Sequence, residues 1–198
     1  MKRELAGGRV LFLGSFPKEV PVLGMPEVAV AGRSNVGKSS CLNRLVGVRQ
    51  AARVSSTPGR TQAINLFQVQ ERYILADLPG YGFARVPEAV QQGWQALVEG
   101  YLAGDRDLRL VLLLIDPRRE AGGMDAELLW SLREARLPVL VVATKLDKLS
   151  RQKGRSALAR LARDYHLSRG ELMGFSALKG DGLDELKKAI DARVKARK

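Results

Sequence analysis

Cysteine and histidine are almost absent from this chain, which has one of each, Cys41 and His166, in 198 residues. One cysteine excludes an intramolecular disulfide, and with a single histidine it cannot build a structural zinc site. Long apolar runs are lacking too: the longest covers residues 110–115, whereas a bilayer-spanning helix needs about 20 residues. The first residues also lack the apolar stretch of a secretory signal. We therefore expect a cytoplasmic globular protein with no membrane attachment.

Acidic residues are outnumbered, with 21 Asp and Glu against 33 Lys and Arg and a formal net charge of +12. The excess is uneven along the chain. Residues 1–62 carry 10 basic and 3 acidic side chains, residues 145–198 carry 15 and 7, and the middle is slightly acidic. Two basic ends indicate a polyanionic partner, with nucleic acid first among the candidates. The alternative is charge that serves general solubility.

Short apolar runs alternate with amphipathic stretches, which is typical of βαβ units around a mostly parallel sheet. Strands are expected at residues 27–31, 64–69, 73–77, 110–116, 139–144 and near Phe175, with helices at 38–46, 88–103, 124–135, 156–165 and after Asp181. Three residues separate 64–69 from 73–77, too few for a crossover helix, so these strands should pair antiparallel at one edge. The sequence thus predicts a three-layer α/β domain with a six-stranded sheet over residues 26–198, preceded by an N-terminal extension over 1–25.

The clearest motif is a complete G-x-x-x-x-G-K-[ST] loop, the P-loop, which reads Gly32-Arg33-Ser34-Asn35-Val36-Gly37-Lys38-Ser39. It lies between a predicted strand and a predicted helix. Its glycines let backbone amides turn inward around phosphate oxygens, and the helix N-terminus adds the positive end of its dipole. Lys38 would bring a positive charge to the β- and γ-phosphates, and the Ser39 hydroxyl could ligate Mg²⁺.

Three further motifs follow predicted strands: Asp77-Leu78-Pro79-Gly80, Thr144-Lys145-Leu146-Asp147 and Phe175-Ser176-Ala177. In the first, Asp77 offers a carboxylate to the water shell of Mg²⁺, and the glycine amide can face a γ-phosphate. In the second, the Asp147 carboxylate can accept hydrogen bonds from guanine N1 and the 2-amino group, and adenine has neither donor there. The third would place backbone amides near guanine O6. Together with the P-loop, these motifs predict a GTP site.

These motifs, together with Thr57-Pro58-Gly59-Arg60-Thr61-Gln62 and the continuation Tyr81-Gly82, resemble the EngB (YihA/YsxC) family of GTPases. The resemblance implies a Ras-like P-loop fold and hydrolysis of GTP to GDP and phosphate, as in the translation-factor-type GTPases. It also implies a role in assembly of the large (50S) ribosomal subunit and in normal cell division and septation. The expected partners are GTP, GDP, the large subunit and its RNA, and the protein is expected to be a monomer.

The resemblance also implies roles for single residues. Thr61 would be the second protein ligand of Mg²⁺ beside Ser39, in a first switch segment that wraps the γ-phosphate with Gly59, Arg60, Thr61, Gln62 and Ala63. Thr144 stands where most GTPases have Asn, which removes a tethering amide, so modest affinity is expected. Asn35 could hold K⁺ between the phosphates, or it could only shape the loop. The catalytic candidates are Lys38, Thr61 and Asn35.

Tyr81 follows the Asp-x-x-Gly motif, at the position where Ras-like proteins hold a water-positioning glutamine. Its phenol is expected to lie away from the phosphate, so intrinsic hydrolysis should be slow. Four arginines lie in or beside the first switch, where they form a basic surface for RNA phosphates or a merely solvated loop: Arg44, Arg49, Arg53 and Arg60. The basic C-terminus, residues 193–198, is a second candidate patch.

Two other functions stay open at this stage. One is a nucleotide-dependent kinase that shares the P-loop, and the other is an RNA-binding module whose nucleotide site is vestigial. Cys41 is expected to be a small buried residue rather than a nucleophile. Trp94 and Trp130 lie within helical patterns, where packing is expected rather than stacking on bases.

Overall fold

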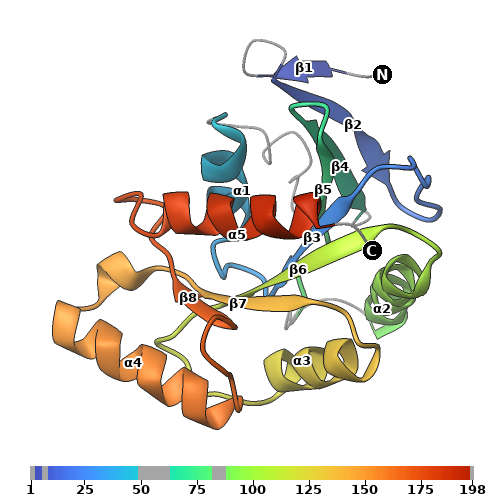
Figure 1. The fold of residues 1–198 in the computed structure, drawn as a ribbon. Helices are drawn as coiled ribbons and strands as arrows, with labels where there is room; N and C mark the ends of the chain where they lie inside the picture. The colour runs from blue at the N-terminus through green and yellow to red at the C-terminus, as the bar shows by residue number, and fades with distance from the viewer. Residues whose placement is uncertain (1–2, 6–8, 49–62, 82–87, 197–198) are drawn as a thin grey trace.

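Figure 1 shows one mixed sheet with helices on both faces, in a computed structural model that describes residues 3–5, 9–48, 63–81 and 88–196. Within these residues, eight strands follow the order β1-β2-β4-β5-β3-β6-β7-β8. The expected three-layer P-loop fold is therefore present. The predicted six strands are two too few, because β1 and β2 extend the sheet beyond the expected edge.

The parallel half of the sheet is formed by β5 (Tyr73–Asp77), β3 (Glu27–Gly32), β6 (Leu108–Ile115), β7 (Val139–Ala143) and β8 (Leu172–Gly174). Every residue of β3 is buried, since helices cover both faces of a parallel sheet. The burial of β3 agrees with its sequence, in which small and branched apolar residues follow Glu27. Because these strands all point the same way, their carboxyl ends lie along one edge.

The antiparallel half contains β1 (Arg3–Leu5), β2 (Val10–Phe16) and β4 (Ile64–Val69), which pairs with β5. The antiparallel β4–β5 pair was predicted, but it does not lie at the edge, because β2 pairs with β4 and β1 pairs with β2. β2 lies in the segment that the sequence assigned to the N-terminal extension. Its register shifts between Phe12 and Gly14, and this irregularity breaks the alternation by which a strand is normally predicted.

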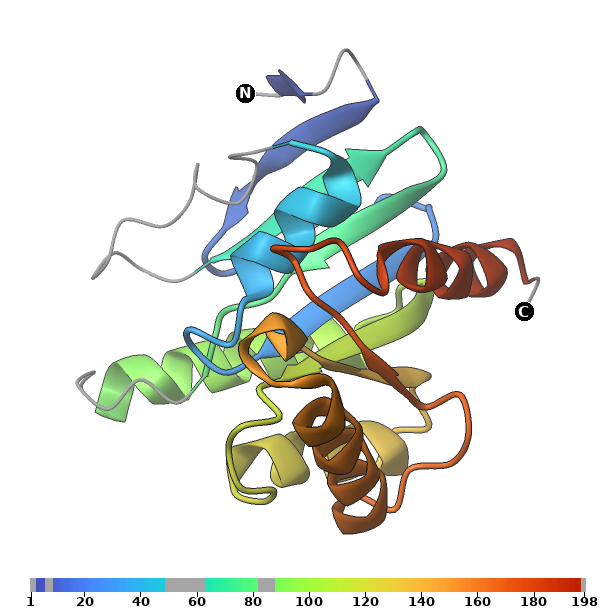
Figure 2. The same cartoon turned by 90° about the vertical axis from the view of Figure 1, so that its left-hand side faces the viewer.

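Five α-helices in the described residues divide between the two faces, as Figure 2 shows from the side. Helices α1 (Lys38–Val46) and α5 (Leu183–Lys195) pack on one face through residues such as Leu42 and Ile190. Helices α2 (Glu88–Ala103), α3 (Met124–Glu134) and α4 (Arg151–Asp164) cover the other. Each face has its own hydrophobic core.

Two details of the helices were judged from sequence. Cys41 is buried in α1, as expected, and this burial raises the pKa of its thiol to about 12. The predicted start of the fourth helix at residue 156 is wrong, because α4 begins at Arg151. The Ser150 side chain caps the helix by accepting from the Lys153 amide, and Gly154 continues within it.

Gly182 fixes the start of α5 against the end of β8. Its φ is +79°, and an added Cβ would lie 2.2 Å from the Gly174 carbonyl oxygen. Gly170 has a similar φ of +92° but nothing within 4 Å of an added Cβ, so it is a matched control. Gly170→Ala should cost only the left-handed strain, about 1–2 kcal/mol of unfolding free energy, whereas Gly182→Ala should cost at least about 2 kcal/mol more. Urea denaturation measures both; equal losses would contradict the close approach.

Candidate functional site

The predicted motifs meet at the carboxyl edge of the parallel strands. The P-loop follows β3, Asp77 ends β5, Thr144 follows β7, and Phe175 follows β8. This edge is where ligands bind in open α/β sheets, because the helices that follow the strands leave a crevice there. Figure 1 shows that segments far apart in the sequence come together at this edge.

The P-loop has the backbone that its glycines require. A Cβ on Gly32 would lie 2.8 Å from the Leu114 carbonyl oxygen, so only glycine fits. Asn35 and Gly37 adopt positive φ values of 63° and 108°, which turn the loop into α1. Gly37 is the N-cap of α1, and no side chain caps the helix, so its first amides are left to an anionic ligand.

Lys38 forms an ion pair with Asp77, with Nζ 2.5 Å from Oδ1. Both side chains are largely buried, at 14% and 6% exposure. The second carboxylate oxygen of Asp77 accepts a hydrogen bond from Asn65 at 3.3 Å, and Asn65 accepts one from Ser15 at 2.6 Å. Asn65 and Ser15 were not found from the sequence, because only the register of β2, β4 and β5 brings them to Asp77.

Thr144 joins the segment after β7 to the P-loop. Its hydroxyl lies 2.7 Å from the Val36 carbonyl and 3.2 Å from the Ile115 carbonyl, and the residue is only 2% exposed. The amide that Asn would supply is absent, but the shorter hydroxyl side chain makes a connection of its own, and the expected modest affinity stays a prediction. Lys145 adds a second connection, since its ammonium donates to the Asn35 carbonyl.

Asp116 follows β6 at the same edge and was also missed. Burial alone would raise the pKa of its carboxyl, but hydrogen bonds from Arg118 and Lys145 outweigh this effect and lower the pKa to about 2. Asp116 Oδ2 lies 3.2 Å from Lys145 Nζ. Asp116 therefore stays ionised and holds the Lys145 side chain against the P-loop. The available signal was its position as the last residue of the predicted strand 110–116.

Asp147 accepts a hydrogen bond from the buried Ser176 hydroxyl at 2.7 Å, which joins the second and third motifs after β7 and β8. The amides of Phe175 and Ser176 donate to the Ala143 and Asp181 carbonyls. They are thus engaged within the protein rather than directed at a ligand. Ala177 is the remaining one of the three residues whose amides were predicted to face guanine O6.

Arg44 lies at this edge. Its guanidinium donates to the Ala177 carbonyl at 2.5 Å and to the Leu178 carbonyl at 3.0 Å. Arg44 therefore supports the loop after β8 from the side of α1. The other three arginines of the predicted patch, Arg49, Arg53 and Arg60, lie outside the described residues.

Tyr81 directs its phenol toward α3, where the hydroxyl donates to Asp125 Oδ1 at 2.7 Å. Burial first, and the neighbouring Asp125 second, raise the pKa of Tyr81, so the phenol stays protonated. The backbone of Tyr81 pairs with Arg33, and its carbonyl accepts from the Ser34 amide at 2.8 Å. The side chain thus lies away from the P-loop, as expected.

The remaining predicted site residues divide by placement. Leu78 is buried and its amide donates to Val30, while Gly80 lies close to Ser34, where an added Cβ would approach within 3.3 Å. Ala63 directly precedes β4. Four predicted residues lie outside the described residues: Gly59, Arg60, Thr61 and Gln62.

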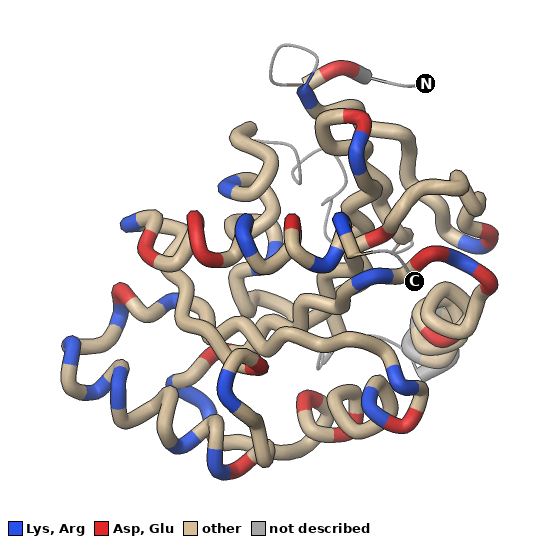
Figure 3. The backbone as a smooth tube through the Cα atoms, viewed as in Figure 1, with Lys and Arg blue, Asp and Glu red and all other residues tan. Residues whose placement is uncertain are grey.

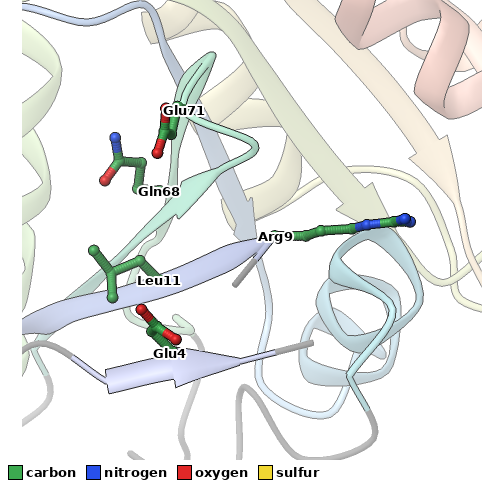
Figure 4. Close-up of a pocket in the computed structure, with 5 residues that line it drawn as sticks. All are labelled: Glu4, Arg9, Leu11, Gln68 and Glu71. Carbon is green, nitrogen blue, oxygen red and sulfur yellow. The ribbon is translucent and has the colours of Figure 1, made fainter. Parts of the chain in front are cut away.

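A pocket in the described residues lies far from the carboxyl ends of the parallel strands. A small pocket beside β1 and β2 is lined by Glu4, Arg9, Leu11, Gln68 and Glu71 (Figure 4). It lies near the start of β5, whereas Asp77 ends that strand.

In the described part of the chain, no group of three or more His, Cys, Asp or Glu could hold a metal, and no helix has the length and apolar character to cross a membrane.

The Thr144 tether can be tested by substitution. Thr144→Val removes the hydroxyl while keeping the side-chain volume, so the unfolding free energy should fall by about 1–3 kcal/mol. Thr144→Ser keeps the hydroxyl and should lose much less. Urea denaturation of the nucleotide-free protein measures both. If the valine variant is as stable as the serine variant, the hydroxyl does not tie the two segments together.

Comparison with known proteins agrees with this geometry. A family model described as "50S ribosome-binding GTPase" matches residues 27–145. The chain is 46% identical over 176 residues to a probable GTP-binding protein EngB of Geobacter sp. (strain M21), covering 89% of this chain and 82% of that protein. The EngB protein of Geobacter metallireducens is also 46% identical, over 183 residues, with 92% and 90% covered.

Solved structures give the same result. A crystal structure of a probable GTP-binding protein EngB matches with a TM-score of 0.69 and 25% identity, covering 86% of this chain and 99% of that one. Aquifex aeolicus Era bound to GDP and AlF4⁻ matches in fold, with a TM-score of 0.67 and 23% identity over 89% of this chain and 59% of that one. The chain therefore belongs to the EngB family of GTP-binding proteins and is a GTPase.

Proposed function

We propose that GTP binds along the carboxyl edge of the parallel strands and that its hydrolysis switches the protein during assembly of the large ribosomal subunit. The observation that carries the site is the pair of connections from Thr144 and Lys145 to the P-loop, because they join the loop proposed to hold the phosphates to the segment proposed to hold the base. The ribosomal role is supported by the description of the matching family model. A need in cell division and septation is part of the same proposal.

The phosphates would be held by the P-loop amides and the Lys38 ammonium. An incoming phosphate offers Lys38 a second anion beside Asp77, in a largely buried position where charge interactions are strong. Leu78 and Pro79 connect Asp77 to Gly80, whose amide would face the γ-phosphate. The Asn65 hydrogen bond would hold the second Asp77 oxygen if Lys38 turned to the phosphate.

Mg²⁺ fits the donor set at this edge. Ser39 is exposed in the first turn of α1, and Asp77 ends the neighbouring strand. A site of one hydroxyl, a nearby carboxylate and phosphate oxygens suits Mg²⁺, which keeps several waters and needs no cage of protein ligands. Ser39 and Thr61 would hold the ion, which neutralises charge on the β- and γ-phosphate oxygens. Asn35, exposed on the P-loop, would be the residue for K⁺.

The guanine base would lie between the segments after β7 and β8. The Ser176 bond orients the Asp147 carboxylate and leaves its second oxygen for guanine donors. The Lys145 stem, fixed by Asp116, would lie along the base plane. The Leu146 side chain packs against Gly174 at the end of β8, where an added Cβ would lie 2.3 Å from it. The Ala177 amide is the donor assigned to guanine O6.

Base selection can be tested at Asp147. Asp147→Asn should weaken GDP binding about 100-fold, roughly 3 kcal/mol, because a carboxylate facing two donors becomes an amide that clashes with one of them. Xanthine nucleotides should gain affinity in exchange. Titration calorimetry with GDP and XDP measures both, and Asp164→Asn on α4 is the control for the same chemical change away from the site. An unchanged GDP affinity in Asp147→Asn would refute the base assignment.

Metal and γ-phosphate contacts can be separated by two hydroxyl deletions. Ser39→Ala should lower Mg²⁺-dependent binding of both GTP and GDP. Thr61→Ala should lower only GTP binding, about 10-fold, because the first switch closes only on a γ-phosphate. Titration of fluorescent GDP and a non-hydrolysable GTP analogue, with and without Mg²⁺, distinguishes the two. Equal losses for both nucleotides in Thr61→Ala would argue against a switch role.

The ribosomal role requires a direct measurement. Co-sedimentation with purified large subunits should recover more protein with a non-hydrolysable GTP analogue than with GDP, since only the γ-phosphate orders the switch segments. Small subunits serve as the control. Equal recovery with both nucleotides, or no preference for the large subunit, would reject the proposed switch while leaving GTP hydrolysis intact.

A further inference from the structure

Helix α4 carries an unbalanced charge. It has one acidic residue, Asp164, against five basic ones: Arg151, Lys153, Arg155, Arg160 and Arg163. Helix α5, on the other face of the sheet, mixes both signs in similar numbers. Figure 3 shows the contrast: blue segments follow one another along α4, whereas red and blue alternate along α5.

Three of these arginines form one exposed stripe. Arg151, Arg155 and Arg163 are four and eight residues apart, so they share a side of the helix over about 18 Å. Among the described residues, no carboxylate pairs with Arg151 or Arg155. Arg163 pairs only with its neighbour Asp164 and remains 77% exposed. Arg160 differs, because it donates to the Pro117 and Arg119 carbonyls.

Two of these basic residues lie where their charge is unfavourable for the helix itself. Arg151 and Lys153 lie in the first turn, which has no acidic residue. Cations at a helix N-terminus oppose the macrodipole, whereas acidic residues there would stabilise it. Arg151 and Lys153 therefore do not stabilise α4 through its dipole, whereas Arg163 in the last turn does, and their exposure makes all three available to an anionic partner.

An exposed aromatic side chain lies at the far end of α4. Trp130 of α3 is 41% exposed, and the Arg133 guanidinium lies over its ring, 5.1 Å from the centroid. Arg133 also donates to the Tyr165 and His166 carbonyls, which follow α4 directly. The indole is thereby fixed beside the end of the arginine stripe. The helical pattern predicted packing in the core or at the surface, and Trp130 lies at the surface.

We propose that α4 and Trp130 form a binding surface for single-stranded RNA. Arg151, Arg155 and Arg163 contact phosphates along one strand, and the indole of Trp130 stacks on an unpaired base at the end of the stripe. The choice of RNA rests on the proposed ribosomal function. None of these four residues belongs to the nucleotide site, so their contribution is the same with GDP and with a GTP analogue.

The charge contribution is tested with a fluorescein-labelled RNA hairpin that has an unpaired loop, using anisotropy over a range of salt concentrations. Arg151→Gln, Arg155→Gln and Arg163→Gln together should reduce the slope of log affinity against log salt by about 2. The control removes three exposed charges elsewhere by Lys18→Gln, Lys187→Gln and Lys188→Gln, and should leave the slope nearly unchanged. Equal effects of the two sets would overturn the proposal, because net charge alone would then explain binding.

The stacking contribution has its own readout. Trp94→Phe leaves Trp130 as the only tryptophan, and the unpaired-loop hairpin should quench its fluorescence, whereas a fully paired RNA duplex should not. Trp130→Leu should weaken hairpin binding about 10-fold. Absence of quenching by the hairpin would overturn the role of Trp130. All variants are assayed for GTP hydrolysis and nucleotide-dependent subunit binding, so loss of RNA binding with both intact separates this surface from the proposed switch.

Discussion

The hydrogen bond from the Thr144 hydroxyl to the Val36 carbonyl is the contact on which the geometry of the nucleotide site depends. It joins the loop after β7 to the loop after β3, although β6 lies between these strands in the sheet. The contact is buried, so a missing partner would leave a polar group without solvent compensation. Lys145 and Asp116 strengthen the same connection with charge. The spacing between phosphate and base segments is therefore fixed by the protein itself.

A second set of contacts connects this site to the antiparallel half of the sheet. Lys38 and Asp77 are too buried for solvent to compensate either charge alone, so each requires the other or a ligand. Asn65 limits how the Asp77 carboxylate can turn, and Ser15 in turn orients Asn65. β2 thus has a functional consequence as well as a structural one: it supports the residue that positions the carboxylate facing the P-loop.

Local motifs predicted most residues of the candidate site from the sequence. The others could not be predicted, because they reach the site only through the pairing of strands that are far apart in the chain. Asp77 ends a strand, and the P-loop and the segment from Thr144 to Asp147 come at the ends of two others, so their place in the chain alone put them at one edge. Asn65 and Asp116 carry no motif, and their roles follow from strand pairing. β2 was not predicted, because its bulge interrupts the alternation of the strand. Helix α4 starts earlier than its apolar periodicity indicated, because the Ser150 side chain caps it. The role of Thr61 stays a prediction, since that residue lies outside the described structure.

The location of α4 determines what its proposed RNA surface could report. α4 begins four residues after Asp147, which the proposal places against the guanine base. The base is common to GDP and GTP, so any coupling through this end of α4 distinguishes nucleotide-bound from nucleotide-free protein, and linkage requires RNA to shift guanine-nucleotide affinity by the same factor. In the proposed site the γ-phosphate would be sensed elsewhere, beside the P-loop and Gly80. Attachment to RNA and response to hydrolysis would therefore be separate functions, one through α4 and the other through the switch segments.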